Sequence, residues 1–330
     1  MRERTSTPLG GKIWASLLTC GFIGQVAWIV ENMYFATFAQ DIFENSPDAN
    51  HLYYLVTTLM VVLSALTATV TTIFAGALTD KVGKRKLFIS IGYIVWGLTI
   101  MLFATIDVDA AASNSTLVIA LFVVFDCVMT LVGSTANDAA FNAWVTDVTD
   151  GTNRGKVNTI LSVMPVIATV AAIAIAMFTY DKGNYTAFFI ILGVIPIAAG
   201  VVSIFLVKDA PGIVRSDMRT AKDVFYGFRP SVVKSNKMMF VCLTALCLVG
   251  ISQQTFFSYL INFVQTTLGI TDYRLPIGAV IVLSAVITGV LGVFYDKLGR
   301  KKFYIPLAAF IVVGTLAIYL TKFLGEGAYL

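Results

Sequence analysis

Two long apolar runs, residues 54–79 and 87–107, are joined by Gly76-Ala-Leu-Thr-Asp80-Lys81-Val-Gly83-Lys84-Arg85-Lys86. Each run is long enough to cross the hydrocarbon core of a bilayer as a helix. Four of the six residues after Asp80 are Lys or Arg, so the positive-inside rule places this connection in the cytoplasm. Gly83 supplies the backbone freedom that a short reversal needs. Asp80 ends a predicted helix, where its charge opposes the helix dipole, so we expect it to have a cationic or helix-N-terminal partner.

The same pattern occurs again near the end of the chain. Residues 292–302 read Gly292-Val-Phe-Tyr-Asp296-Lys297-Leu-Gly299-Arg300-Lys301-Lys302, which keeps the Gly, Asp, Lys, Gly and final Lys of the first stretch. Two copies in the same membrane context indicate a duplicated half-domain.

This repeated pattern resembles the signature of the major facilitator superfamily, in which it follows the second and the eighth membrane helix. The resemblance implies an all-α fold of two six-helix bundles around a central cavity lined by helices one, four, seven and ten. It also implies that the first copy of the motif locks against helix eleven. The second copy follows the predicted eighth span, so we expect the chain to stop after helix nine and Asp80 to lack that partner.

Composition and charge support a membrane protein. The 330 residues are 58% hydrophobic and only 13% charged, and the mean hydropathy is +0.84. The net charge of +4 forms no patch for nucleic acid, because 20 of the 23 basic residues fall in loops that alternate to one side. That sorting predicts a multi-pass protein of the plasma membrane with its N-terminus in the cytoplasm.

Apolar runs predict nine membrane spans and three domains. The domains are an N-terminal six-helix bundle (1–207), a cytoplasmic linker (208–237) and a partial C-terminal bundle (238–330). The spans are 13–40, 54–79, 87–107, 115–146, 157–180, 185–207, 238–268, 274–295 and 303–323.

Three carboxylates lie inside these spans: Glu31 in the first, and Asp126 and Asp138 in the fourth. A charge inside the membrane is costly unless it faces a cavity or a partner, and the nine predicted spans contain Lys or Arg only at their ends, Arg274 and Lys322. A desolvated carboxyl group can take up and release a proton near neutral pH, or bind Na⁺ with neighbouring oxygens. We therefore expect all three acids to bind the coupling ion.

Polar residues mark the inward faces of spans one, four and seven. In span four, Asp126, Thr130, Ser134, Asp138 and Asn142 recur every four residues, which predicts one polar stripe on an α-helix. The alternative is that these residues only pack helices together. An aromatic ring beside amides and carboxylates is one way to hold a sugar, although Trp28 can equally be a packing residue. The residues expected to bind the solute are Gln25, Trp28, Asn32, Asn137, Asn142, Gln253, Gln254, Tyr259 and Asn262.

Residues 137–156 narrow the resemblance further. An Asp on helix four, an aromatic-rich turn and then acids with Arg154-Gly155 resemble the glycoside, pentoside and hexuronide cation symporters. By that resemblance Asp138 belongs to the substrate or cation site. That family carries Asp residues on helix two for its cation, whereas residues 54–79 offer only Ser and Thr. We therefore expect proton coupling, with Na⁺ as the alternative.

Charged residues at the predicted cytoplasmic surface are candidates for an ion-pair gate. The alternative is that they are ordinary exposed loop charges, each contributing under about 1 kcal/mol. The gate residues expected are Gly76, Asp80, Arg85, Asp147, Arg154, Asp296 and Arg300.

The sequence as a whole predicts a secondary transporter for a small polar solute, with sugar or glycoside as the expected class and symport as the expected mode. A solute-binding or sensing protein on the same fold is the alternative. An enzyme is disfavoured because the only histidine, His51, lies in a predicted outside loop and no metal-ligand spacing or nucleophile-base pair occurs. We expect a monomer in the bilayer, with a small-molecule solute as its partner and without metal, cofactor or nucleic acid.

Overall fold

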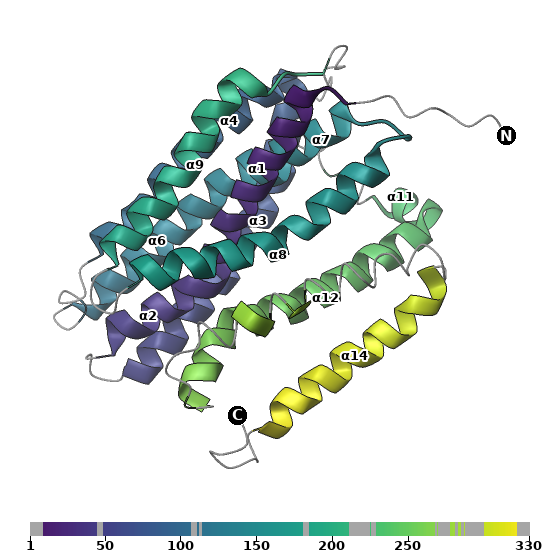
Figure 1. Cartoon of the computed structure of the whole chain (residues 1–330). Coiled ribbons are helices and arrows are strands. Elements are labelled where there is room, and N and C mark those ends of the chain that lie inside the picture. The colour runs from purple at the N-terminus through teal and green to yellow at the C-terminus, as the bar shows by residue number, and fades with distance from the viewer. Residues whose placement is uncertain are drawn as a thin grey trace.

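The structure is a computed structural model, and every regular element that it describes is a helix (Figure 1). The residues described are 9–44, 49–106, 111, 114–180, 185–210, 225, 229–267, 269, 278–280, 283–284, 287 and 300–321. Seven helices within this part of the chain are long and apolar enough to cross a membrane, and they match the first seven predicted spans.

The first span consists of three consecutive helical segments of two types. It consists of α1 (Gly11–Ile29), a π-helical segment η1 (Val30–Tyr34) and α2 (Phe35–Phe43). A π-helix bonds each residue five positions along instead of four, and such segments are common at functional sites. Here the segment contains Glu31 and Asn32.

The second and third spans are α3 (Ala49–Val82) and α4 (Arg85–Leu102), and the short helix η2 (Phe103–Thr105) ends the third. Gly83 turns the chain between them with a φ of 67°, so the glycine predicted for this reversal is confirmed.

The fourth span also contains a π-helical segment. It runs through α6 (Ser115–Gly133), η3 (Ser134–Phe141) and α7 (Asn142–Val148). The fifth and sixth spans are α8 (Arg154–Thr179) and α9 (Thr186–Leu206).

These six spans pack into one bundle. Figure 1 shows α1 beside α8 and α4 beside α9, which are also the two most extensive helix contacts. The backbones of α4 and α9 approach closely, because a Cβ atom on Gly97 would lie 2.2 Å from the carbonyl oxygen of Gly193. An aromatic cluster fills the end of the bundle remote from Gly83, and it contains Phe35, Phe38, Phe103, Phe122, Phe188 and Phe189.

The C-terminal part is described in fewer pieces. A short helix α11 (Pro230–Ser235) precedes α12 (Lys237–Asn262), which continues as the π-helical segment η5 (Phe263–Thr267). Helix α14 (Arg300–Thr321) coincides with the ninth predicted span and lies outermost in Figure 1. Most of the eighth predicted span lies outside the described residues.

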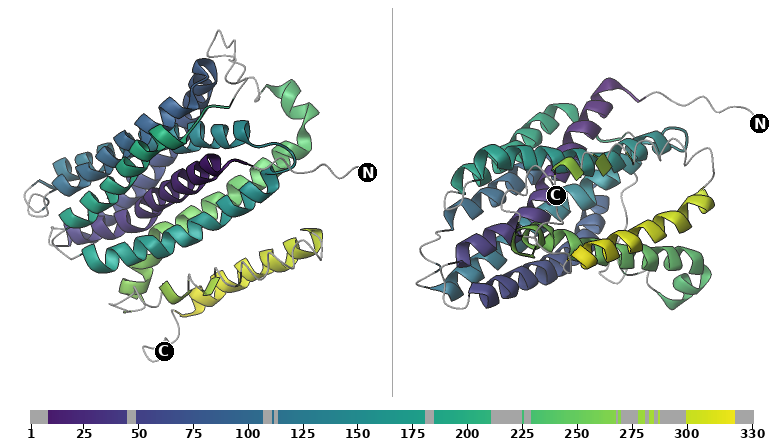
Figure 2. Two further views of the ribbon diagram at one scale, coloured as in Figure 1. Left: turned by 45° about the horizontal axis from the view of Figure 1, so that its top comes forward. Right: turned by 60° about the horizontal axis from the view of Figure 1, so that its bottom comes forward.

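Helix α12 meets the bundle through its second half. It contacts η1 and α2, and Figure 2 shows it running alongside α8. Three of the helices predicted to line a cavity, the first, the fourth and the seventh, therefore converge around the π-helical segment of the first.

Candidate functional site

A cavity of about 400 Å³ opens between the first, second, fourth and seventh spans. We call it the solute cavity, and its volume is in the range of small-molecule sites. The residues lining it are Gln25, Trp28, Glu31, Asn32, Val61, Ser64, Ala65, Ala68, Thr130, Asp138 and Gln254. Six of the residues predicted from the sequence to bind solute or the coupling ion are in this set.

Two further cavities adjoin it. A second cavity of about 400 Å³ lies towards α8 and includes Pro165, Thr169 and Gln253. A narrow cavity of about 20 Å³ has Glu31 and Asp126 in its wall together with Thr57 and Ser64. Asn32 and Gln254 border all three cavities, so these two amides stand at their junction.

The carboxylates of Glu31 and Asp126 are close enough for their charges to interact. Glu31 Oε1 accepts a hydrogen bond from Thr130 Oγ1 at 3.3 Å. Asp126 is only 1% exposed, and neither of its carboxylate oxygens has a hydrogen-bond partner among the described residues. A buried carboxylate without a partner is costly, and native proteins keep such groups mainly at functional sites.

Asp138 lies on η3 and lines the solute cavity. The residue before it, Asn137, points away from that cavity. Asn137 is 4% exposed and its Nδ2 donates to the hydroxyl of Tyr93 at 2.6 Å, so it does not line the solute cavity. Asn142 is exposed, and its Nδ2 donates to the backbone oxygen of Asp138 at 3.2 Å. Neither Asn137 nor Asn142 is among the residues that line the solute cavity, and their contact with the solute stays a prediction.

The reason is the π-helical geometry of η3. Five-residue hydrogen bonding places more residues in each turn, so a four-residue spacing no longer returns to the same face. Asp126 and Thr130 on α6 follow the predicted stripe towards Glu31, whereas Asn142 beyond η3 leaves it.

Tyr93 joins three helices at this level. Its hydroxyl donates to the carbonyl oxygen of Cys20 on α1 at 2.7 Å and accepts from Asn137 on η3. No sequence pattern singled out Tyr93, because an isolated tyrosine in an apolar run has no characteristic spacing.

Removing this hydroxyl tests the connection. We expect Tyr93→Phe to lower the free energy of unfolding by about 1 kcal/mol, since it leaves a buried amide and a buried carbonyl with fewer partners. Thermal unfolding of the protein in nanodiscs measures the effect. Tyr54→Phe is the control, because Tyr54 is 54% exposed. Equal melting temperatures for the two variants would contradict this role.

Amide side chains connect the seventh span to the first. Gln254 Nε2 donates to Asn32 Oδ1, and Asn262 Nδ2 donates to Gln40 Oε1. Gln253 borders the second cavity, and Tyr259 packs against the apolar core. Thus Gln253 and Gln254 of the predicted set reach a cavity, whereas Asn262 holds α12 to α2.

Trp28 forms one wall of the solute cavity. Its ring packs against Trp96 with the ring centroids 5.0 Å apart and the planes tilted by 56°. The ring therefore packs against a neighbour and also lines the cavity, and its contact with a solute stays a prediction.

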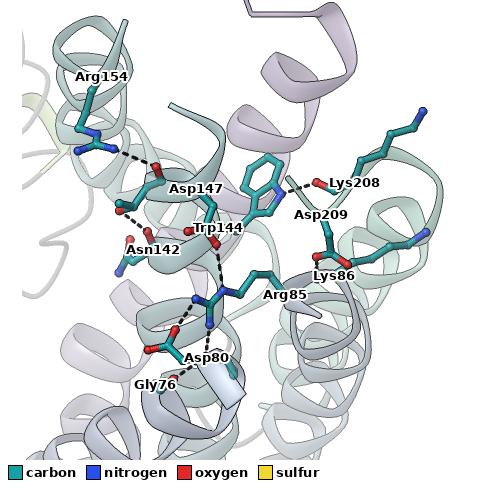
Figure 3. A network of polar contacts seen from close by, with 12 residues as sticks. Gly76, Asp80, Arg85, Lys86, Asn142, Trp144, Asp147, Arg154, Lys208 and Asp209 are labelled. Atoms are coloured by element: carbon teal, nitrogen blue, oxygen red, sulfur yellow. Dashed lines mark hydrogen bonds and ion pairs between the residues drawn. The ribbon is translucent and has the colours of Figure 1, made fainter. Parts of the chain in front are cut away.

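Arg85 is the centre of a polar network at the other end of the bundle (Figure 3). Its guanidinium forms an ion pair with Asp80, donates to Asp147 Oδ2 at 3.1 Å and donates to Thr79 Oγ1 at 2.6 Å. Thr79 Oγ1 in turn donates to the backbone oxygen of Gly76 at 2.9 Å. The expectation that Asp80 has a cationic partner is therefore confirmed, and the partner is Arg85, five residues away in the same motif.

Two more contacts attach the end of the sixth span to this network. The indole of Trp144 donates to the backbone oxygen of Lys208 at 2.8 Å, and Asp209 Oδ1 accepts from the backbone N–H of Lys86 at 2.8 Å. Asp209 thereby occupies the N-terminal turn of α4, where a negative charge is favourable. The network thus joins the ends of the second, third, fourth and sixth spans (Figure 3).

Arg154, a predicted gate residue, contacts the end of the fourth span. Its guanidinium donates to the backbone oxygens of Thr146 at 2.9 Å and Thr149 at 3.0 Å, and to Thr149 Oγ1 at 3.1 Å. These bonds cap the end of α7. Of the other predicted gate residues, Asp296 and the side chain of Arg300 lie outside the described residues.

Comparison with known proteins supplies the family. A family model described as Major Facilitator Superfamily matches residues 11–330. The chain belongs to the major facilitator superfamily. No curated protein matches it. The protein is therefore a multi-pass, all-α membrane protein of a transporter superfamily, and the cavity between its first, fourth and seventh spans is the candidate site.

Proposed function

We propose that this superfamily member is a secondary transporter that moves a small polar solute by alternating access, coupled to a proton. The observation that carries the proposal is the solute cavity, where two carboxylates, three amides and an indole converge from spans one, four and seven.

The charges of the cavity restrict the solute. Glu31 and Asp138 line it, and none of the described residues that line it is Lys or Arg. Within the seven described spans, every Lys and Arg lies among the first or last three residues of its helix. The field in the cavity is therefore negative, which favours a neutral or cationic solute over an anion.

A sugar or glycoside suits the polar groups. Gln25, Asn32 and Gln254 offer both donors and acceptors to hydroxyl groups, and the carboxylates are strong acceptors. The indole of Trp28 offers an apolar face to the C–H side of a sugar ring. The resemblance of residues 137–156 to the glycoside, pentoside and hexuronide symporters supports the same class.

The contacts of α12 suggest how access alternates. Gln254 and Asn262, both in the second half of α12, hold it to the first span. The network around Arg85 lies at the opposite end of the bundle and is built within residues 76–209. We infer that the described state is closed at the end remote from Gly83, and that opening there requires these amide pairs to break.

Coupling is assigned to the carboxylates. Protonation of Asp138 makes the solute cavity less negative, so ion and solute occupancy become linked through the same space. Glu31 and Asp126 are the further carboxylates expected to bind the coupling ion.

Counterflow in proteoliposomes tests the function. Vesicles containing the protein are loaded with one of a panel of neutral sugars, amino acids or small organic cations, and entry of the labelled compound is followed. Saturable counterflow for one class supports transport, with a neutral sugar as the expected result. Saturable binding without counterflow would instead indicate a binding or sensing protein.

Trp28→Ala is expected to raise the KM for that solute about tenfold, because a lost aromatic face corresponds to about 1.4 kcal/mol of binding free energy. Trp14→Ala is the matched control, since Trp14 lies near the start of α1 with Lys156 Nζ over its ring, away from the solute cavity. An unchanged KM in the Trp28 variant would remove this residue from the solute site.

A further inference from the structure

A groove on the outer face of the bundle is separate from the three cavities. Its volume is about 300 Å³, and it lies between α4 and the junction of α6 with η3. Leu87 and Ile91 on α4 and Leu131 on α6 line it, and each of these side chains is about half exposed. None of the described residues that line the groove borders the solute cavity or its two neighbours. The groove therefore opens towards lipid and not towards the solute.

The lining of the groove is almost entirely hydrocarbon. Thr135 is the only residue with a polar side chain among the described residues that line it, and its hydroxyl already donates to the backbone oxygen of Leu131 at 2.8 Å. At Gly92 the helices α4 and η3 are in contact, because a Cβ atom there would lie 2.5 Å from the Cβ of Ala136. The groove therefore offers apolar contacts to a hydrocarbon chain and little to a polar solute.

The dimensions of the groove fit a single acyl chain. A water molecule takes up about 30 Å³ in the liquid and a methylene group is of similar size, so 300 Å³ holds about ten methylene groups. The wall from Leu87 to Val95 is about 12 Å long at 1.5 Å per residue, less than half of the roughly 30 Å hydrocarbon core. A helix of a second copy would need a seam along most of the membrane. A chain from one leaflet needs only this length.

A lysine lies at the end of the groove where the headgroup of such a lipid would be. Lys84, the N-cap of α4, precedes Leu87 and Phe88 by three and four residues, so it occupies the same helix face. It is exposed and forms no ion pair with any described residue, whereas the adjacent Arg85 is paired with two carboxylates. Lysines at a membrane surface attract anionic lipids. The charge of Lys84 is therefore complementary to a lipid phosphate.

We propose that this groove binds one acyl chain of an anionic phospholipid, whose phosphate contacts Lys84. The lipid belongs to the leaflet at the Gly83 end of the bundle, which the basic loops predict to be the cytoplasmic one. The proposal goes beyond transport and depends on neither the solute nor the coupling ion.

The groove and the solute cavity share η3. Thr135 lines the groove and Asp138, three residues later in the same π-helical segment, lines the solute cavity. A chain held between α4 and η3 adds apolar contacts to one side of this segment while its other side carries Asp138. Bound lipid therefore restrains the segment that positions this carboxylate.

Native mass spectrometry of the purified full chain tests the site. The probes are dioleoyl phosphatidylglycerol and dioleoyl phosphatidylcholine, which have the same acyl chains and differ in net charge. We expect one phosphatidylglycerol molecule per chain to bind about fivefold more tightly than phosphatidylcholine, the factor expected for one lysine at a lipid surface. Lys84→Gln should abolish this preference. Ile91→Trp keeps Lys84 but fills the groove, and should weaken the binding of both lipids.

Lys12→Gln is the matched control, because Lys12 is an exposed lysine at the start of α1, outside the groove, and its loss should keep the preference. In nanodiscs of phosphatidylcholine alone, both lysine variants should melt within about 1 °C of the unmodified protein, which shows that they are folded.

Equal binding of the two lipids by the unmodified protein, or an unchanged preference in Lys84→Gln, would overturn the proposal. So would undiminished lipid binding by Ile91→Trp. A dimer of the unmodified chain that Ile91→Trp dissociates would also overturn it, because a second copy would then occupy the groove. None of these measurements involves a solute, so their outcome is independent of the counterflow that tests transport.

Discussion

Vesicles that contain the Asp138→Asn variant are expected to accumulate no solute against its gradient. A gradient of two pH units can support up to about 100-fold accumulation when one proton moves with each solute, because each pH unit corresponds to 1.36 kcal/mol. The asparagine keeps the approximate shape of a protonated carboxyl group but cannot exchange a proton. The ratio of inside to outside solute should therefore fall to about one. Uptake of labelled solute under an imposed pH gradient measures it.

Solute exchange provides the internal comparison for this variant. Exchange needs the solute site but no net proton movement, so Asp138→Asn should still exchange labelled for unlabelled solute at a measurable rate. Glu44→Gln, with a carboxylate removed outside the cavities, should accumulate as the unmodified protein does. Continued pH-driven accumulation by Asp138→Asn would contradict proton coupling through this residue.

Helix positions were predictable because lipid imposes a simple rule. Every backbone polar group must be bonded inside the membrane, so a long apolar run has to be helical. The first seven predicted spans match described helices to within a few residues, including the reversal at Gly83. The start of the second span shifted by five residues, because the helix begins at Ala49 and includes the polar residues Asn50 and His51 before the apolar run.

The candidate site was only partly predictable. Glu31, Asp126 and Asp138 were identifiable from the sequence because a carboxylate inside an apolar span is energetically costly and is therefore usually functional. The direction in which each side chain faces was not identifiable from the sequence. A π-helical segment changes the number of residues per turn, and no residue composition marks where such a segment occurs. Asn137 is an example, because the spacing predicts that it faces the solute, whereas in the structure its amide donates to Tyr93.

Contacts between segments far apart in the sequence could not be predicted for a different reason. Asp80 and Asp147 are 67 positions apart and both contact Arg85, but the sequence alone allowed Asp147 several cationic partners. Lys208 contributes its backbone oxygen to Trp144, and a carbonyl has no residue-type signature. Pairings of this kind are decided by packing, which brings the ends of four spans together.

The network around Arg85 is mechanically connected to the site. Asp147 lies on α7, which directly continues the π-helical segment that carries Asp138. Helices α3 and α4 both pack against that segment. If Arg85 holds α7 against the ends of α3 and α4, it also limits how η3 can move, so the solute cavity depends on a contact outside it.

Replacing Arg85 by alanine is therefore expected to destabilise the bundle strongly. Arg85 is 5% exposed, and its loss leaves Asp80 and Asp147 without this cation, with Asp80 near the negative end of the α3 dipole. Breaking a fully buried pair costs 3–5 kcal/mol, and because both acids are partly exposed we expect about 2 kcal/mol here. The melting temperature in nanodiscs should fall by about 5 °C.

Lys84→Gln, which removes an exposed neighbouring charge, should melt within about 1 °C of the unmodified protein. Arg85→Lys should fall between the two, because an ammonium keeps the charge but cannot reach Asp80, Asp147 and Thr79 together as the guanidinium does. If Arg85→Ala melted together with Lys84→Gln, the network would be a set of surface charges and the proposed link to η3 would not hold.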